Sequence, residues 1–278
     1  MNDTTRSPTR LGLAAAIAIT LALPTVAAAL APETTDAKVI MQAVEDRATL
    51  DKVRVRIQMT ITDKSGSTRS RVVQSRTMKF TGGTKQVLFF ESPADVRNTA
   101  MLSVDWDDGA KDDDQWLWLP SLHKATRISG GDRSGAFMGS DFSYADMTKK
   151  DPKQYDYKIV KQSAKVRGEE CWVIEARPRS DKEMKETGYV KSLVWVSKSK
   201  LLPVQMKTWV REGKKLKFMI AEELKQVGGV WIPHKMTMRT VQGREVQSTT
   251  VLSFVDYKAN QADVKESDFT QRRLEQGL

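Results

Sequence analysis

Apolar and polar residues alternate regularly along much of this chain. From Val53 to Thr62 the sequence reads VRVRIQMTIT, with an apolar side chain at every second position. Successive side chains of a β-strand point to opposite faces, so this segment predicts a strand with one buried and one solvated face. Turn signals follow at Lys64 to Ser67 and at Thr81 to Thr84, which is typical of antiparallel hairpins.

The same pattern predicts on the order of a dozen antiparallel strands. After a run ending at Phe80, they lie near residues 85–91, 101–106, 115–119, 122–129, 155–163, 166–177, 190–198, 202–211, 214–227, 231–241 and 245–257. Helical signals are few. Asp36 is expected to cap a short helix with Val39, Ile40, Ala43 and Val44 on one face, and a closing helix is expected near 267–276. So few helices cannot cover this sheet, which must curl into a sandwich, barrel or half-barrel around its apolar face.

The first 29 residues have the layout of a secretory signal peptide. Arg6 and Arg10 precede the apolar run from Leu11 to Leu23, and a small-residue stretch follows Pro24. The run is shorter than the roughly 20 residues that a membrane-spanning helix needs. We therefore expect cleavage near residue 29, a single domain over residues 30–278, and a protein in the periplasm that is not itself a lipoprotein.

Composition excludes several kinds of chemistry. One cysteine and two histidines in 278 residues argue against a disulfide scaffold, an iron–sulfur protein and a histidine-rich metal centre. The net charge of +10 falls only to +9 when Arg6, Arg10 and Asp3 are removed with the signal peptide. In a secreted protein, this surplus favours transient contact with anionic membranes over nucleic acid. No cofactor and no catalytic residue is predicted.

Residues 127–146 form an irregular stretch in which four glycines are mixed with Phe, Met and Tyr. Such a stretch is either an ordinary loop ending in a helix cap at Ser140 or Asp141, or a lid over a cavity. Arg133, Ser140 and Asp141 are the polar candidates for holding such a lid. Six aspartates between Asp105 and Asp114 predict a solvated hairpin loop, with calcium binding and partner docking as the alternatives.

Several short motifs resemble the LolA-like outer-membrane lipoprotein-sorting family, in particular its longer branch found beside RND-type exporters. They are GSDFSYADM at 139–147, WLWLP at 116–120, CWVIEA at 171–176, LPVQ at 202–205 and WIPHKM at 231–236. The resemblance implies a mainly β (α+β), LolA/LolB-like fold, in which a strongly curved antiparallel sheet forms a half-open β-barrel closed by N-terminal, central and C-terminal short helices. It also implies a non-enzymatic carrier that moves the acyl chains of lipoproteins or lipids from an inner-membrane exporter to an outer-membrane acceptor.

Large apolar residues of the strands and of the lid are the candidates for contact with acyl chains. Methionine suits a cavity that accepts chains of variable shape, whereas tryptophan in a sheet serves packing more often than ligand binding. The candidates are Val55, Ile57, Met59, Phe89, Trp116, Trp118, Phe137, Met138, Phe142, Tyr144, Trp172, Trp195 and Met206. Two alternatives stay open: an envelope scaffold whose barrel core is filled, and a hydrolase that uses His123 or Ser134.

Overall fold

The computed structural model describes residues 30–277, so the predicted signal peptide lies outside the described residues. Within that range, no helix is both long and apolar enough to cross a membrane. Thirteen strands dominate the structure: β1 (Val53–Asp63), β2 (Thr68–Phe80), β3 (Gly83–Ser92), β4 (Ala100–Trp106), β5 (Asp114–Leu119), β6 (Lys124–Ile128), β7 (Tyr155–Val166), β8 (Glu169–Pro178), β9 (Tyr189–Ser197), β10 (Leu202–Val210), β11 (Lys215–Val227), β12 (Val230–Gln242) and β13 (Glu245–Lys258). Three short α-helices accompany them: α1 (Ala37–Asp46), α2 (Asp181–Thr187) and α3 (Gln271–Gln276).

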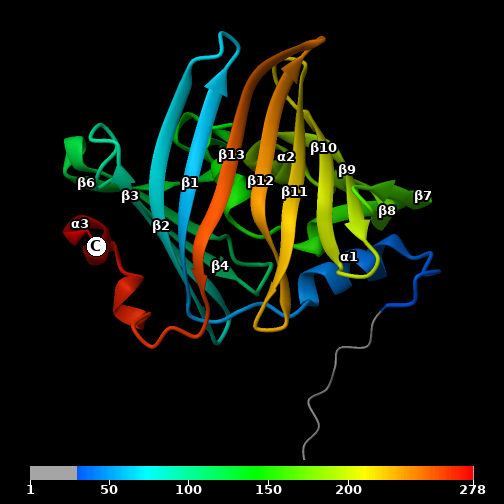
Figure 1. Cartoon of the computed structure of the whole chain (residues 1–278), viewed down its shortest axis with the longest axis horizontal. Coiled ribbons are helices and arrows are strands. Elements are labelled where there is room, and N and C mark those ends of the chain that lie inside the picture. The colour runs from blue at the N-terminus through cyan, green and yellow to red at the C-terminus, as the bar shows by residue number, and fades with distance from the viewer. Residues whose placement is uncertain (1–29, 278) are drawn as a thin grey trace, which may run out of the picture.

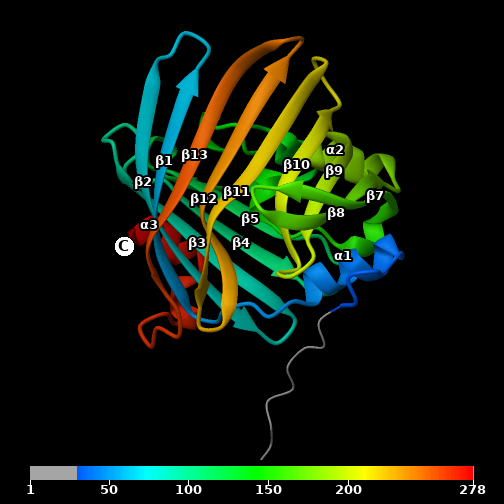
Figure 2. The same ribbon diagram turned by 45° about the vertical axis from the view of Figure 1, so that its right-hand side comes forward.

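All thirteen strands belong to one antiparallel sheet in the order β6-β5-β4-β3-β2-β1-β13-β12-β11-β10-β9-β8-β7. The sheet curls strongly but β6 and β7 do not pair, so it forms an unclosed half-barrel (Figures 1 and 2). We call β1–β6 its first arm and β7–β13 its second arm. The predicted curved antiparallel sheet with few helices is thereby confirmed.

The inner face of the half-barrel is filled by the segment between β6 and β7, residues 129–148, which we call the lid segment. It contains three short 3-10 turns, at Gly130–Ser134, Phe137–Gly139 and Tyr144–Met147. Phe137 and Phe142 are 2% and 3% exposed and pack against inner residues of β1–β4 and β11–β13, including Met59, Phe90 and Met238. The predicted helix cap at Ser140 or Asp141 is wrong, because Ser143 caps the last 3-10 turn with Asp146 as its capping-box partner.

Helix α1 covers the inner face of the other arm. The Asp36 side chain accepts hydrogen bonds from the backbone N–H groups of Lys38 and Val39, as the predicted N-cap requires. Ile40 is fully buried and packs with Trp172, Ile174, Val194 and Val196 of β8 and β9. Val39, however, is 46% exposed, since the buried stripe runs through Ala37 and Ile40 instead.

The C-terminal segment crosses the outer face of the first arm, opposite the lid. Val264, Phe269 and Leu274 pack onto outward side chains of β2–β5, including Phe89 and Trp118. An ion pair of 3.0 Å between Arg76 and Asp268 joins the same surfaces. Strand β5 is therefore covered on both faces, with Leu117 packed against the inner cluster and Trp118 beneath the C-terminal segment.

Candidate functional site

An apolar cavity of about 270 Å³ lies between α1, the lid segment and the inner face of β7–β12. Five methionines line it: Met41, Met206, Met219, Met236 and Met238. Phe142, Tyr155, Tyr157 and Val194 complete most of the apolar wall, and Asp146, Lys150 and Ser192 add a few polar groups. Methionine side chains are flexible and polarisable, so such a wall adapts to an apolar ligand of irregular shape.

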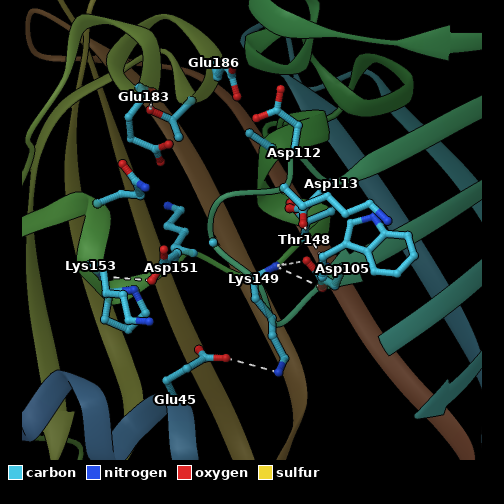
Figure 3. Close-up of a pocket in the computed structure, with 18 of the residues that line it drawn as sticks. Glu45, Asp105, Asp112, Asp113, Thr148, Lys149, Asp151, Lys153, Glu183 and Glu186 are labelled. Atoms are coloured by element: carbon cyan, nitrogen blue, oxygen red, sulfur yellow. Dashed lines mark hydrogen bonds and ion pairs between the residues drawn. The ribbon is translucent and has the colours of Figure 1, made fainter. Parts of the chain in front are cut away.

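A polar vestibule of about 370 Å³ adjoins this cavity (Figure 3). The two spaces share Glu45, Thr148, Lys150 and Pro152, so they lie side by side. The vestibule lies between the 105–114 loop of one arm and α1, α2 and the start of β7 on the other. Acidic side chains and lysines from both arms therefore face one another across the open edge of the half-barrel.

Arg133 of the lid segment joins the two sides of this vestibule. Its guanidinium lies 3.2 Å from both Asp113, in the 105–114 loop, and Glu186, in α2, and donates to the Thr148 hydroxyl at 2.8 Å. The three charged side chains are only 12% to 16% exposed, so water screens these pairs weakly. Lys182 of α2 adds an exposed bridge of 2.6 Å to Asp112.

Asp141 fixes the middle of the lid to the sheet. Its carboxylate accepts hydrogen bonds from the hydroxyls of Thr240, Ser248 and Thr250 on β12 and β13, and its backbone N–H donates to Thr250 at 2.9 Å. Ser140 is buried beside it, and its hydroxyl accepts from the Phe142 N–H. The polar pair predicted at 140–141 therefore anchors the lid, although no sequence signal indicated the three hydroxyl partners.

A buried polar cluster lies where the lid meets the cavity. Burial acts to raise the pKa of Asp146, but the charges of Lys150 and Lys217 and hydrogen bonds from the Ser143 N–H and the Tyr189 hydroxyl outweigh it, so the pKa lies below its usual value. Burial lowers the pKa of Lys217 despite the nearby carboxylates of Asp146 and Asp141. The Arg71 guanidinium donates to the Met138 carbonyl and so holds the preceding 3-10 turn of the lid segment, Phe137–Gly139.

Asp105 is the most perturbed acid of the vestibule. Burial, with the charge of Asp113 beside it, raises the pKa of Asp105 to about 7, although its carboxylate accepts the Lys149 N–H at 3.0 Å (Figure 3). Its neighbours in the acidic tract bind side chains of this chain: Asp112 pairs with Lys182, Asp113 with Arg133 and Asp114 with Arg127. Among residues 30–277, no three acidic, histidine or cysteine side chains converge as metal ligands.

Only some of the predicted contact residues reach the cavity. Phe142 and Met206 line the cavity. The inner cluster, which shares these two residues with the cavity wall, contains Ile57, Met59, Phe137, Met138 and Tyr144. Val55 is buried elsewhere in β1. Trp172 is buried beneath α1. Ser134 donates its hydroxyl to the Gly131 carbonyl, and the exposed His123 lies in the turn before β6.

Four predicted contact residues face away from the cavity. Phe89, Trp116 and Trp118 pack on the outer face beneath the C-terminal segment, and Trp195 faces outward from β9, between Val194 and Val196. We therefore do not retain these four as cavity residues. The cause is the strand period: a one-residue step moves a side chain to the other face, and aromatic character alone does not say which face is inside.

Sequence reasoning missed most of the methionine wall. Met219, Met236 and Met238 are cross-strand neighbours on β11 and β12, with Met219 directly paired to Met238. The alternation of Met236 and Met238 within WIPHKMTM placed them on one face, and this was the available signal. The alternation did not indicate where α1 and the lid segment lie, and these two elements enclose the cavity on that face.

This unclosed sheet, with a lid segment and an apolar cavity, defines a LolA-like fold, as the motifs predicted. The chain is 28% identical to an outer membrane lipoprotein-sorting protein domain from Vibrio parahaemolyticus, with a TM-score of 0.76 over 86% of this chain and 98% of that chain. A DUF1329 family protein from Desulfovibrio piger is 25% identical, with a TM-score of 0.75 over 85% and 97%. A LolA superfamily protein from Nitrosomonas europaea, 21% identical with a TM-score of 0.64 over 86% and 99%, shares the fold.

A family model described as "Uncharacterized protein" matches residues 82–276, which is more than half of the chain, so the chain belongs to that family. No curated protein sequence matches the chain.

Proposed function

We propose that this protein is a periplasmic carrier that takes an acyl chain of a lipoprotein or lipid into the methionine-lined cavity. The observation that carries the proposal is the cavity itself, an apolar space beside a polar vestibule. Moving one methylene group out of water gains about 0.8 kcal/mol, so ten buried methylenes would contribute roughly 8 kcal/mol. A carrier of this kind binds through apolar burial and needs no catalytic group.

Two observations support the proposal. The Vibrio parahaemolyticus domain, whose name describes lipoprotein sorting, aligns with 86% of this chain at 28% identity. The predicted signal peptide fits a protein that works outside the cytoplasm. In this proposal an inner-membrane exporter, such as one of the RND type, donates the lipid, and an outer-membrane acceptor receives it.

The lid segment must move for a long chain to enter. A cavity of about 270 Å³ is below the usual range of roughly 300–1,000 Å³ for ligand pockets. Phe137 and Phe142 occupy the inner face that a longer chain would need. We therefore assign Arg133 as the latch of the lid and the Asp141 cluster as its anchor, so that outward movement of the latch enlarges the cavity.

Filling the cavity tests the proposal. Met206→Trp and Met238→Trp place larger side chains in the wall of the cavity, and we expect each to weaken binding of a fluorescent fatty acid at least about tenfold. Leu274→Ala is the matched control, because it costs about 2–5 kcal/mol of stability on the opposite face of the sheet and leaves the cavity intact.

Native mass spectrometry of the gently purified protein should also show bound lipid. Equal fatty-acid binding by the cavity variants and the wild type would contradict the carrier proposal. An empty protein that binds no fatty acid would favour the scaffold alternative instead, in which the lid permanently fills the half-barrel.

A further inference from the structure

The outer face of β9–β11 carries an aromatic surface that no helix covers. Paired residues of neighbouring antiparallel strands face the same side, so Leu193 and Trp195 on β9, Trp209 on β10, and Leu216, Phe218 and Ile220 on β11 share one face. We call these six residues the outer aromatic patch. They face away from Met206, Met219 and Val194, which belong to the inner clusters.

The patch lies on the exposed side of the half-barrel. In Figures 1 and 2 no helix of residues 30–277 runs across the front of β10 and β11, while α1 and the lid lie on the inner side of the sheet. All six side chains are half-buried rather than fully buried. Lys207 and Gln205 of β10 lie between the apolar residues of β9 and β11, so this face combines aromatic with polar side chains. An aromatic surface that no other element covers is a place where another molecule can make contact.

Cations surround the rings. The Lys191 ammonium lies 4.6 Å from the ring centre of Trp209, and Lys207 lies 4.8 Å from Trp209 and 5.7 Å from Phe218. Arg239 of β12 is exposed and pairs in register with Phe218. Ammonium groups beside aromatic rings combine positive charge with apolar surface, which suits the boundary between lipid headgroups and acyl chains.

Positive side chains outnumber negative ones on this face. Glu175 and Glu222 are each already paired with two cations: Glu175 with Arg177 and Lys191, and Glu222 with Arg167 and Lys235. Within the described residues, Lys207 and Arg239 lie within 4.0 Å of no carboxylate. Both charges are therefore available to an anionic partner.

We propose that the outer aromatic patch, with Lys191, Lys207 and Arg239, docks the protein on anionic phospholipid membranes. The proposal deepens the carrier function and rests on it, since it names the surface that meets the membrane during loading or delivery. Basic residues near an anionic bilayer are attracted to its headgroups, and the aromatic rings add apolar contact at the headgroup boundary.

Vesicle co-sedimentation tests this surface. We expect the wild type to bind vesicles of equal parts phosphatidylcholine and phosphatidylglycerol, and to bind pure phosphatidylcholine far less. Lys207→Glu with Arg239→Glu should lower binding to the anionic vesicles at least about tenfold. The matched control, Lys124→Glu with Lys165→Glu, makes the same charge change at exposed positions on β6 and β7, and should retain most of the binding.

Contact of the rings themselves is measured separately. Brominated phosphatidylglycerol should quench tryptophan emission of the wild type, and Trp209→Phe should reduce that quenching. If the double charge reversal fails to fold, Lys207→Gln with Arg239→Gln takes its place and is expected to weaken binding in the same direction.

A fluorescent fatty-acid assay on the same variants separates the two proposals. Loss of vesicle binding by the patch variant alone, with unchanged fatty-acid binding, supports the docking surface. The docking surface is contradicted if the patch and control variants lose vesicle binding equally, or if the wild type does not bind anionic vesicles. Neither result contradicts the carrier function. A wild type that binds no fatty acid overturns the carrier function instead.

Discussion

At the scale of single residues, Arg133 is the side chain that ties the lid segment to both sides of the vestibule. It contacts partners from two elements that are distant in sequence, and both partners are nearly buried. Losing one member of a buried ion pair is costly because the remaining charges are left without compensation.

Arg133→Gln should therefore lower the free energy of unfolding by about 3 kcal/mol, because Asp113 and Glu186 lose their shared cation. It should also speed fatty-acid uptake, since the lid loses its tie to α2. Urea unfolding and stopped-flow fluorescence measure the two effects. Arg127→Gln is the control: its pair with Asp114 is exposed and contributes about 0–1 kcal/mol. Identical behaviour of the two variants would remove Arg133 from the role of latch.

The sequence indicated Arg133 as a candidate for holding the lid, but it did not indicate the residues that Arg133 contacts. The residue stood out as a charged group among glycines and aromatics, whereas Asp113 lies 20 positions before it and Glu186 lies 53 positions after it. Pairs at such separations arise only when the sheet brings distant loops together. The same holds for Asp141, whose hydroxyl partners on β12 and β13 are about a hundred residues away.

At the scale of elements, strands were the predictable part. Alternation is a local signal, and predicted strands such as 202–211 and 231–241 match β10 (Leu202–Val210) and β12 (Val230–Gln242) closely. Helix α2 has only seven residues and no apolar stripe, so periodicity could not indicate it. The sequence nevertheless contains residues typical of both helix ends: Ser180 is the N-cap of α2, and Gly188 ends the helix in the left-handed conformation.

The 105–114 loop should give the protein a distinct pH dependence through Asp105. The native pKa of about 7 exceeds the unfolded value near 3.9, so the native state holds the proton more tightly. Stability is thus lost as pH rises from about 4 through 7, and this contribution levels off above about pH 8. Asp105→Asn keeps an acceptor for the Lys149 N–H, and should be more stable than the wild type at pH 8 by on the order of 2 kcal/mol.

Urea midpoints of both proteins between pH 5 and 8 measure this difference. The two midpoints should converge toward pH 5, where Asp105 holds its proton. Asp107→Asn, at an exposed position of the same loop, should follow the wild type throughout. Parallel profiles for the wild type and Asp105→Asn would show that Asp105 does not titrate in this range.

At the scale of the whole molecule, the sequence predicted a curled sheet but not how far it closes. Closure depends on which surfaces cover each face, and here the faces are covered differently along the sheet. The C-terminal segment covers the outside of β2–β5, whereas α1 and the lid cover the inside of β7–β12 and leave β9–β11 bare outside. Five of the seven tryptophans therefore divide between three environments that one alternating pattern cannot distinguish: the outer cluster, the α1 interface and the outer aromatic patch.

The half-barrel should consequently work as two arms held together by a removable lid. Gly188, at the end of α2, lies close enough to the lid that a Cβ built on it would be 3.0 Å from the Cβ of Ser134. Disulfides join Cβ atoms roughly 3.5–4.5 Å apart, so a small outward shift suffices for Ser134→Cys with Gly188→Cys. The left-handed conformation of Gly188 adds a strain of about 1–2 kcal/mol, which the cross-link offsets.

We expect the oxidised double variant to take up fluorescent fatty acid at least about tenfold more slowly than the wild type, because a cross-linked lid cannot leave α2. Reduction with dithiothreitol should restore the rate, which distinguishes a locked lid from a damaged cavity. Each single cysteine variant serves as a control, and the native Cys171 is buried in β8, away from the pair. If uptake by the oxidised variant equals that of its reduced form, ligands reach the cavity without movement of the lid, and the entrance must then lie in the vestibule between α1 and the 105–114 loop.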